Sequence, residues 1–213
     1  MIITTQKPLD EVLDFISPYK NILIVGCDGC NQPPRGLREA KTLSQLLELG
    51  GKLRKKDFNF KTTTTAKQCD YYLIASGLKP QIDGVDAVLS LACGIGVQTL
   101  AELFPGLPVF PAQNSHFMGA ELREQSFFEV RCGGCGDCLL AETGGICPYV
   151  RCTKSLLNGA CGGAKDGKCE LDPKRDCGWC LIYEQLKKLN KLDLLKEYRP
   201  PRDYQLTGWR ITS

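Results

Sequence analysis

The distribution of cysteine constrains the fold of this chain more than any other feature. Of its 13 cysteines, nine lie between Cys132 and Cys180, and the other four are spread over residues 1–131. The segment that holds the nine is rich in glycine, with Gly-Gly pairs beginning at residues 133, 144 and 162, and it contains few apolar runs. Such a segment cannot bury enough apolar surface to be stable alone, so we expect bound metal to stabilise it.

The first residues and the net charge of the chain indicate the cellular compartment and the kind of partner to expect. The first residues do not form a signal peptide, and no run of about 18 apolar residues occurs, so we expect a soluble, cytoplasmic protein without a membrane span. In a reducing cytosol, dense cysteines are more typical of zinc or iron–sulfur ligands than of disulfides. The balance of 27 basic and 24 acidic residues gives a net charge of +3, which is too weak to indicate nucleic acid as a partner.

Residues 1–130 alternate between helical and strand patterns. This order predicts a Rossmann-like or flavodoxin-like α/β domain with a parallel sheet. We expect helices over residues 9–16, 36–55, 66–75 and 97–104, and strands over 21–26, 58–63, 86–91 and 108–110. We expect residues 131–213 to form a small, cysteine-rich, cluster-stabilised domain with a C-terminal helix. The basic tail that follows is interpreted either as a solvated terminus or as a docking arm for a larger partner.

Four cysteines are expected at one edge of the predicted sheet. Cys27 and Cys30 follow the first apolar strand directly, and Cys93 follows the strand that ends near residue 91. Open α/β sheets place ligands at the carboxyl ends of their strands, and Cys69 precedes or begins a helix that can reach the same edge. These four thiols could therefore hold zinc or a [4Fe–4S] cluster.

Two other interpretations of this group stay open. A C-x-x-C after a strand is also found as a thioredoxin-like dithiol, although thioredoxin folds use a different strand order. Cys69 and Cys93 could be ordinary buried thiols, because free cysteine is among the most buried residue types. The glycines at 94 and 96 allow close backbone approach, but they are weak evidence of nucleotide binding without the third glycine of that motif.

The later cysteines give the stronger signal. Cys132, Cys135 and Cys138 form a C-x2-C-x2-C run, and Cys147 is followed by proline. Bacterial ferredoxins bind a cubane cluster with this turn and a more distant Cys-Pro, whereas zinc ribbons use two separated C-x-x-C pairs, so the spacing favours iron–sulfur. Five further cysteines are enough for another metal site with one to spare, and the sequence does not group them: Cys152, Cys161, Cys169, Cys177 and Cys180. Cys180 best fits a structural thiol on the apolar stripe of the last helix.

Other catalytic machinery is not apparent in the sequence. The single histidine, His116, has no partnered serine or aspartate pattern and is expected to be a hydrogen-bonded loop residue. No phosphate-binding glycine loop and no convincing pair of catalytic carboxylates occurs. The sequence therefore favours a carrier of electrons over an enzyme that transforms a substrate.

Several runs of this sequence resemble a known family. They are Arg131-Cys-Gly-Gly-Cys-Gly-Asp-Cys138, Thr143-Gly-Gly-Ile-Cys-Pro148, residues 151–159, Cys161-Gly-Gly163, Gly167-Lys-Cys-Glu170 and, upstream, residues 89–100 and 111–114. Together they resemble the methylenetetrahydrofolate reductase C-terminal domain family. As a freestanding chain, this one is similar to the MetV-type iron–sulfur small subunits of that reductase, which serve one-carbon metabolism in the Wood–Ljungdahl pathway.

The resemblance implies partners and cofactors. The chain would relay electrons from ferredoxin or a larger oxidoreductase to a flavin-containing catalytic subunit that reduces methylenetetrahydrofolate to methyltetrahydrofolate. It implies [4Fe–4S] clusters, two in our expectation, with zinc as a further possibility. The family's cysteine positions fall on Cys27, Cys30, Cys93, Cys132, Cys135, Cys138, Cys147, Cys152, Cys161, Cys169 and Cys177.

One departure and two alternatives accompany this interpretation. After Cys30 the chain continues through residues 31–36, where many family members have further small residues and another cysteine, which puts the donor that docks there in doubt. A zinc-stabilised, redox-silent scaffold that positions the catalytic subunit is the first alternative. The second is an α/β domain that binds a flavin, corrinoid or pterin and catalyses a reaction on its own.

Overall fold

The structure is a computed structural model that describes residues 1–122 and 127–201, with the side chain of Phe117 excepted. Residues 202–213, which are part of the expected basic tail, therefore lie outside the described residues. The chain divides into two compact units, residues 1–116 and 117–213, and each is described by itself. Within the part of the chain that is described, no helix combines the length and the apolar character needed to cross a membrane.

A parallel sheet of four strands forms the centre of the first unit. The strands lie in the order β4 (Asn59–Thr65), β2 (Asn21–Cys27), β5 (Ala87–Ser90) and β6 (Val109–Pro111). The first of these strands along the chain, β2, is thus central, with the second on one side and the third and fourth on the other. This is the beginning of the flavodoxin-like order, and it confirms the predicted α/β class.

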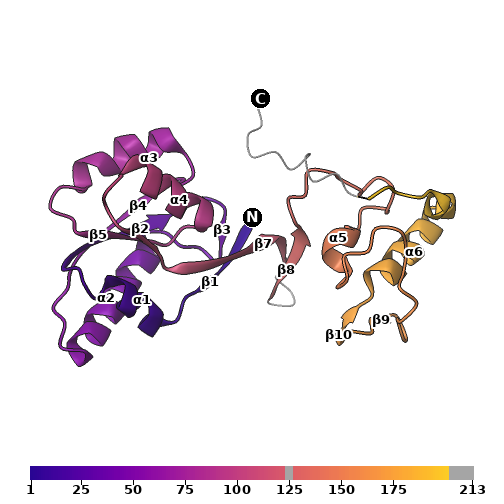
Figure 1. Cartoon of the computed structure of the whole chain (residues 1–213), viewed down its shortest axis with the longest axis horizontal. Helices are drawn as coiled ribbons and strands as arrows, with labels where there is room; N and C mark the ends of the chain where they lie inside the picture. The colour runs from indigo at the N-terminus through magenta and orange to yellow at the C-terminus, as the bar shows by residue number, and fades with distance from the viewer. Residues whose placement is uncertain (123–126, 202–213) are drawn as a thin grey trace. The chain divides into compact units, whose positions relative to one another are not determined.

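Helices cover both faces of this sheet (Figure 1). The alternating side chains of β2 divide between two cores: Ile22 and Ile24 pack with α1 (Leu9–Ile16) and α2 (Leu37–Leu53), whereas Leu23 and Val25 pack with α3 (Tyr71–Leu78) and α4 (Gly94–Leu103). The strand is buried on both sides, which explains its continuous apolar run. A 3-10 turn, η1 (Lys79–Gln81), follows α3.

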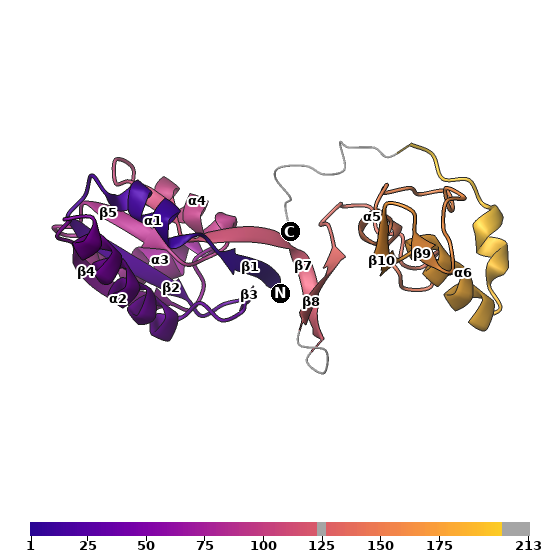
Figure 2. The ribbon, with the colours of Figure 1, turned by 90° about the horizontal axis from the view of Figure 1, so that it is seen from below.

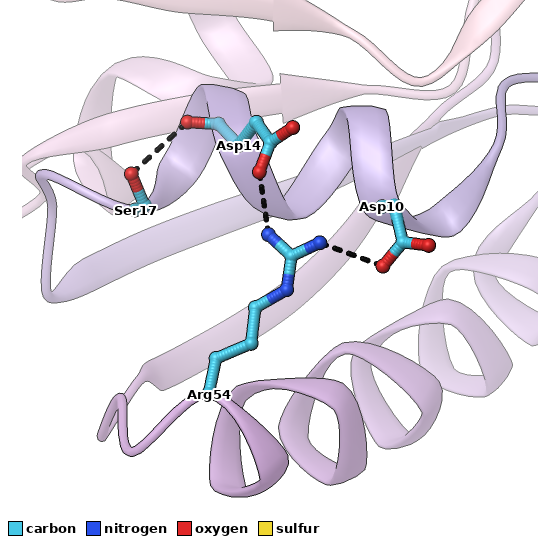
Figure 3. Close-up of polar contacts among 4 residues, drawn as sticks. All are labelled: Asp10, Asp14, Ser17 and Arg54. Carbon is cyan, nitrogen blue, oxygen red and sulfur yellow. Dashed lines mark hydrogen bonds and ion pairs between the residues drawn. The ribbon is translucent and has the colours of Figure 1, made fainter.

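An exposed arginine ties α1 to the end of α2. Arg54, the C-cap of α2, directs its guanidinium nitrogens at Asp14 (2.5 Å) and Asp10 (2.6 Å) of α1, which lie one helical turn apart (Figure 3). The hydrogen bond with Asp14, followed by the one with Asp10, raises the pKa of Arg54. Because the contact is exposed, we expect it to set the alignment of the helices more than their stability.

The predicted elements of the first unit differ from the observed ones mainly at helix starts. The helix over 9–16 has the predicted bounds, whereas α3 begins five residues later than expected. The Asp70 carboxylate accepts hydrogen bonds from the backbone N–H groups of Tyr72 (3.1 Å) and Leu73 (3.2 Å), and this N-cap fixes the start. In α4 the helix begins three residues earlier than expected, directly after Cys93.

A second four-stranded sheet was not predicted from the sequence. Its strand order is β3 (Asn31–Gln32), β1 (Ile2–Gln6), β7 (Gln113–Leu122) and β8 (Phe127–Cys132). Figure 2 shows β7 and β8 as a pair, and their antiparallel register runs from Met118 opposite Cys132 to Leu122 opposite Phe127. The division between the compact units falls within β7. The domain boundary expected between residues 130 and 131 was inferred from the density of cysteines, and it stays a prediction.

The second unit has little regular structure. It contains α5 (Pro148–Arg151), the hairpin of β9 (Lys168–Cys169) and β10 (Asp172–Asp176), α6 (Gly178–Lys188) and the 3-10 helix η3 (Leu192–Lys196). Its core cluster is built on Trp179, Ile182 and Leu186 of α6, which is the expected C-terminal helix. A core of this size is small for a chain segment of this length, as the glycine-rich sequence predicts.

Candidate metal centres

The first candidate centre lies where the order of the main sheet changes direction. Cys27 is the last residue of β2, and Cys93 is the N-cap of α4 just after β5, the strand beside β2. Ligand sites in open α/β sheets form at this point, because the two loops leave the sheet toward opposite faces. Both thiols are buried.

A third cysteine approaches the same place. Burial foremost, together with repulsion from Cys93 and Cys69, raises the pKa of Cys27, while hydrogen bonds from the backbone of Gln68 and Gly29 act in the opposite direction. Cys69 and Cys93 are thus near enough to Cys27 for an electrostatic effect on its thiol. Cys30 belongs to the same loop, but its thiol is exposed, and its carbonyl is held by the N–H of Ile2 at 2.9 Å.

A buried glutamine fastens the three loops to one another. The Gln68 side chain is fully buried, and its amide nitrogen donates to the carbonyl oxygens of Val25 (3.0 Å) and Gly26 (2.8 Å) at the end of β2. Its oxygen accepts the hydroxyl of Ser90 (2.7 Å), and the Ser90 oxygen accepts the N–H of Ala92 (3.2 Å). The residue beside Cys69 therefore holds the strand ends that lead to Cys27 and Cys93.

The loop after Cys27 is also closely held. The Cys27 N–H donates to the carbonyl of Arg35 at 2.7 Å, and the Arg35 Nε donates to Gln113 at 2.8 Å. The Asp28 carboxylate accepts the hydroxyl of Thr64 at 2.8 Å and lies where a side chain on Gly36 would be, 2.1 Å from an ideal Cβ. Residues 31–36, where the sequence departs from the family pattern, are thus held in place beside Cys27.

The second candidate centre, called the first quartet here, consists of Cys132, Cys135, Cys138 and Cys147. These four cysteines line one cavity of about 280 Å³ in the second unit, together with Leu139, Tyr149 and Leu157. Cys132 ends β8, Cys135 and Cys138 lie in the loop that follows it, and Cys147 is the N-cap of α5. The C-x2-C-x2-C run and the Cys-Pro pair are therefore neighbours in space.

Backbone groups of this loop turn toward its sulfur atoms. The N–H of Gly134 donates to the Cys132 sulfur at 3.4 Å, and Gly134 (φ +62°) and Gly136 (φ +77°) adopt left-handed conformations that favour glycine. A Cβ on Gly133 would lie 2.7 Å from the Tyr149 ring, so that ring packs against bare backbone. Amides that point at sulfur are the groups that tune thiolate-bound clusters.

The third candidate centre, the second quartet, consists of Cys152, Cys161, Cys169 and Cys177. All four border a second cavity of about 20 Å³, which has room for about one water-sized group. Cys177 is the N-cap of α6, and its N–H donates to the carbonyl of Gly167 at 2.7 Å. A Cβ on Gly178 would lie 2.9 Å from the backbone nitrogen of Cys152, so this helix start is pressed against the Cys152 loop.

Polar groups contact two sulfur atoms of the second quartet. The Thr153 hydroxyl lies 3.2 Å from the Cys169 sulfur, and this hydrogen bond, followed by backbone hydrogen bonds and the charge of Arg175, lowers the pKa of Cys169. Lys154 pairs with Glu170, whose carboxylate lies 3.6 Å from the Cys161 sulfur. The sequence did not predict these roles of Thr153, Lys154 and Gln68, although each residue lies within two positions of a predicted ligand.

Part of this chain matches a known protein family. Residues 110–205 match the family model described as "Methylene-tetrahydrofolate reductase C terminal". This segment is therefore similar to that family. The matched segment contains both quartets and begins after the cysteines of the first unit. Comparison with curated proteins gave no match, and comparison with solved structures gave none either.

The two quartets differ in what they could hold. Among residues 1–122 and 127–201, no three His, Cys, Asp or Glu side chains converge closely enough to hold a single ion. In the first quartet the thiols instead surround a space much wider than one ion, which fits a polynuclear iron–sulfur group. In the second quartet the space fits one ion, and binding would require the thiols to rotate inward. That these cysteines bind metal stays a prediction.

Two residues complete the comparison with the sequence. His116 lies on β7, not in a loop, and its Nε2 lies 3.1 Å from the Thr5 hydroxyl, so it is the hydrogen-bonded residue that we expected. The predicted place of Cys180 on the buried stripe of α6 was wrong: this stripe includes Trp179, Ile182 and Leu186, and Cys180 is only half-buried beside a large cavity.

Proposed function

We propose that this chain is an iron–sulfur electron-transfer subunit of a methylenetetrahydrofolate reductase complex, of the MetV type. The observation that carries the proposal is the first quartet, whose four cysteines have ferredoxin-like spacing and line one cavity of about 280 Å³. The quartet lies within residues 110–205, which match the reductase family model. The match supports an association with the reductase, and the quartet supports the redox role.

The first quartet would hold a [4Fe–4S] cluster through Cys132, Cys135, Cys138 and Cys147. When bound, such a cluster accepts and passes on one electron with little change in geometry. The chain's own residues would set the potential: the Gly134 N–H at the Cys132 sulfur stabilises negative charge there, and Leu139, Tyr149 and Leu157 limit water at the site.

The partners follow from this role. A flavin-containing catalytic subunit would receive the electrons and reduce methylenetetrahydrofolate to methyltetrahydrofolate. Ferredoxin or a larger oxidoreductase would supply them. The cysteines at the sheet edge of the first unit, Cys27, Cys30, Cys69 and Cys93, would form a further centre, which the buried Gln68 network supports by holding three of their loops in fixed positions.

The second quartet favours a different occupant. Its cavity of about 20 Å³ suits a single zinc ion with Cys152, Cys161, Cys169 and Cys177 as ligands better than it suits a cluster. This observation favours a mixed chain with iron–sulfur in the first quartet and zinc in the second. A chain with zinc only would instead be a redox-silent scaffold that positions the catalytic subunit.

Anaerobic purification followed by metal analysis and electron paramagnetic resonance tests the proposal. We expect iron, with a reduced-cluster signal after dithionite, and loss of that signal in Cys135→Ser. The matched control is Cys180→Ser, which removes a cysteine outside both quartets and should keep its iron. Zinc without iron would overturn the electron-transfer role and favour the scaffold.

A second assay separates electron delivery from substrate chemistry. In complex with the flavin subunit, Cys135→Ser should abolish reduction driven by the protein donor but leave reduction driven by an artificial dye donor unchanged. Equal loss in both assays would contradict the role of this chain as a carrier.

A further inference from the structure

Cys180 is the cysteine of the second unit that borders neither quartet cavity. It is the third residue of α6, and Cys177 is the N-cap of the same helix. Side chains at the N-cap and the third helical position face each other, as the reciprocal contacts of capping boxes demonstrate. The pair therefore forms a C-x-x-C at a helix start, the arrangement that redox-active dithiols use.

The positions of the two residues at the start of α6 bring their side chains near each other. Side chains three residues apart on a helix have Cβ atoms roughly 5–6 Å apart, and a disulfide needs about 4 Å. Cys177 has extended dihedral angles (φ −68°, ψ 119°) outside the helix, so a small rotation at this residue can close the difference.

The pair lies between two cavities of very different size. Cys177 borders the cavity of about 20 Å³ inside the second quartet, and Cys180 borders a cavity of about 650 Å³ lined by Leu157, Tyr183 and other residues. Trp179, between the two cysteines, contributes to both cavities. A small solute can therefore reach the pair from the side of Cys180, while the quartet lies behind it.

We propose that Cys177 and Cys180 form a redox-active dithiol that a peroxide entering the larger cavity converts to a disulfide, which withdraws Cys177 from the second quartet. The formation of the disulfide depends only on the two cysteines. Its effect on a bound ion rests on the proposed function, because it requires that the second quartet hold a metal.

The reaction balances with hydrogen peroxide as the oxidant. The Cys177 thiolate attacks one peroxide oxygen, the O–O bond breaks, and the departing hydroxide takes the proton of the Cys180 thiol and leaves as water. Cys177 is then a sulfenic acid. The Cys180 sulfur attacks the Cys177 sulfur, the S–S bond forms, and the S–O bond breaks. The second hydroxide takes a proton from solvent, so two thiols are oxidised and one peroxide becomes two waters.

Peptide mapping of the full chain tests the disulfide. The reduced protein is treated with one equivalent of hydrogen peroxide, free thiols are alkylated, and the protein is digested with trypsin. Both cysteines fall in one tryptic peptide, residues 176–187, between Arg175 and Lys187. We expect this peptide to lose two hydrogens and escape alkylation. Full alkylation of Cys180 after treatment, or its linkage to Cys161 or another cysteine, would overturn the proposal.

Matched variants connect the disulfide to the quartet. Metal release is followed with a chromophoric chelator during peroxide treatment and again after a dithiol reductant is added. In the wild type, release should be reversed by the reductant. In Cys180→Ser and Cys180→Ala, Cys177 should oxidise further and release should no longer be reversible. Tyr183→Phe, which changes the lining of the same cavity but neither thiol, should behave as the wild type. Reversible release in both Cys180 variants would contradict the role of Cys180.

The same mapping on chelator-treated protein keeps the two proposals apart. If the purified chain holds no metal but residues 176–187 still form the disulfide, the proposed metal centre fails and the dithiol stands. If metal is present and the disulfide does not form in either preparation, the dithiol fails and the metal centre stands.

Discussion

The Ser90 hydroxyl donates a 2.7 Å hydrogen bond to the side-chain oxygen of Gln68 inside the first unit, where both side chains are fully buried. Ser90 ends β5, and Gln68 lies in the loop between β4 and α3. Since the Gln68 amide also binds the end of β2, every polar atom of this side chain has a partner. A satisfied buried network of this kind fixes the relative positions of the elements that it joins.

Replacement of Gln68 should therefore be costly. Gln68→Leu keeps the approximate size of the side chain but leaves two strand carbonyls and the Ser90 hydroxyl with fewer partners, so we expect a loss of about 3 kcal/mol in the free energy of unfolding. Urea denaturation of the reduced chain measures this loss. Gln98→Leu is the control, because Gln98 is exposed on α4 and bonds only its own helix. Equal effects of the two substitutions would refute the network's importance.

Two glycines of the first unit should respond oppositely to alanine. At Gly96 a Cβ would lie 2.7 Å from the Cβ atoms of both Ala92 and Gln68, so Gly96→Ala should lower the melting temperature. At Gly77, an exposed position inside α3, nothing lies within 4 Å of the added atom. Gly77→Ala should then raise stability by roughly 0.5–1 kcal/mol through helix propensity. Calorimetry of both variants compares them directly, and a stabilised Gly96→Ala would contradict the close packing.

Asp86 should make stability depend on pH in acid. Its carboxylate accepts the backbone N–H groups of Asn21 (2.7 Å) and Lys20 (3.2 Å), and these hydrogen bonds, the Asn21 one foremost, hold its pKa below the ordinary 3.8. A depressed folded pKa stabilises the fold above the unfolded pKa, and this stabilisation disappears as the pH falls through the folded value.

Asp86→Asn should accordingly be less stable than the wild type near neutral pH, and the difference should shrink below pH 3.8. Thermal unfolding between neutral pH and pH 2 measures the difference. Asp83→Asn, on the exposed turn before Asp86, controls for a general change in charge. A difference that stays constant over this range would argue against the carboxylate as its source.

Asn158 should hold the segment after η3 in place. Its side-chain nitrogen donates to the carbonyl of Arg199 at 2.9 Å, and its oxygen accepts the Arg199 N–H at 2.8 Å. Loss of both hydrogen bonds in Asn158→Ala should speed tryptic cleavage after Lys196 roughly tenfold. Asn158→Asp keeps the acceptor and should fall between. Unchanged cleavage in Asn158→Ala would mean that other contacts secure this segment.

The sequence predicted well those features that one segment encodes alone. The apolar run of β2 is buried on both faces, and the period of residues 9–16 gives α1 its observed bounds. By contrast, β7 is a strand because of its partners, since its residues Gln113 to Leu122 do not alternate between polar and apolar. Propensity and period do not encode such tertiary pairing.

The candidate centres show the same limit. The spacing of Cys132, Cys135 and Cys138 already keeps them in one short segment of the chain, so their proximity follows from the sequence. The second quartet is assembled from four separate segments, and glycines with positive φ at 159, 162 and 167 lie between its members. Because glycine permits such turns without dictating their direction, sequence spacing does not reveal which cysteines meet.

The pairing of β2 with strands on both sides determines how slowly its amide protons exchange. Every residue of β2 from Asn21 to Cys27 is paired with β4, and four of them are also paired with β5. Amide protons in a strand paired on both sides exchange with solvent only in the largest opening events. Cys27 thus sits at the end of a slowly exchanging strand, while Cys30, three residues on, lies outside the main sheet.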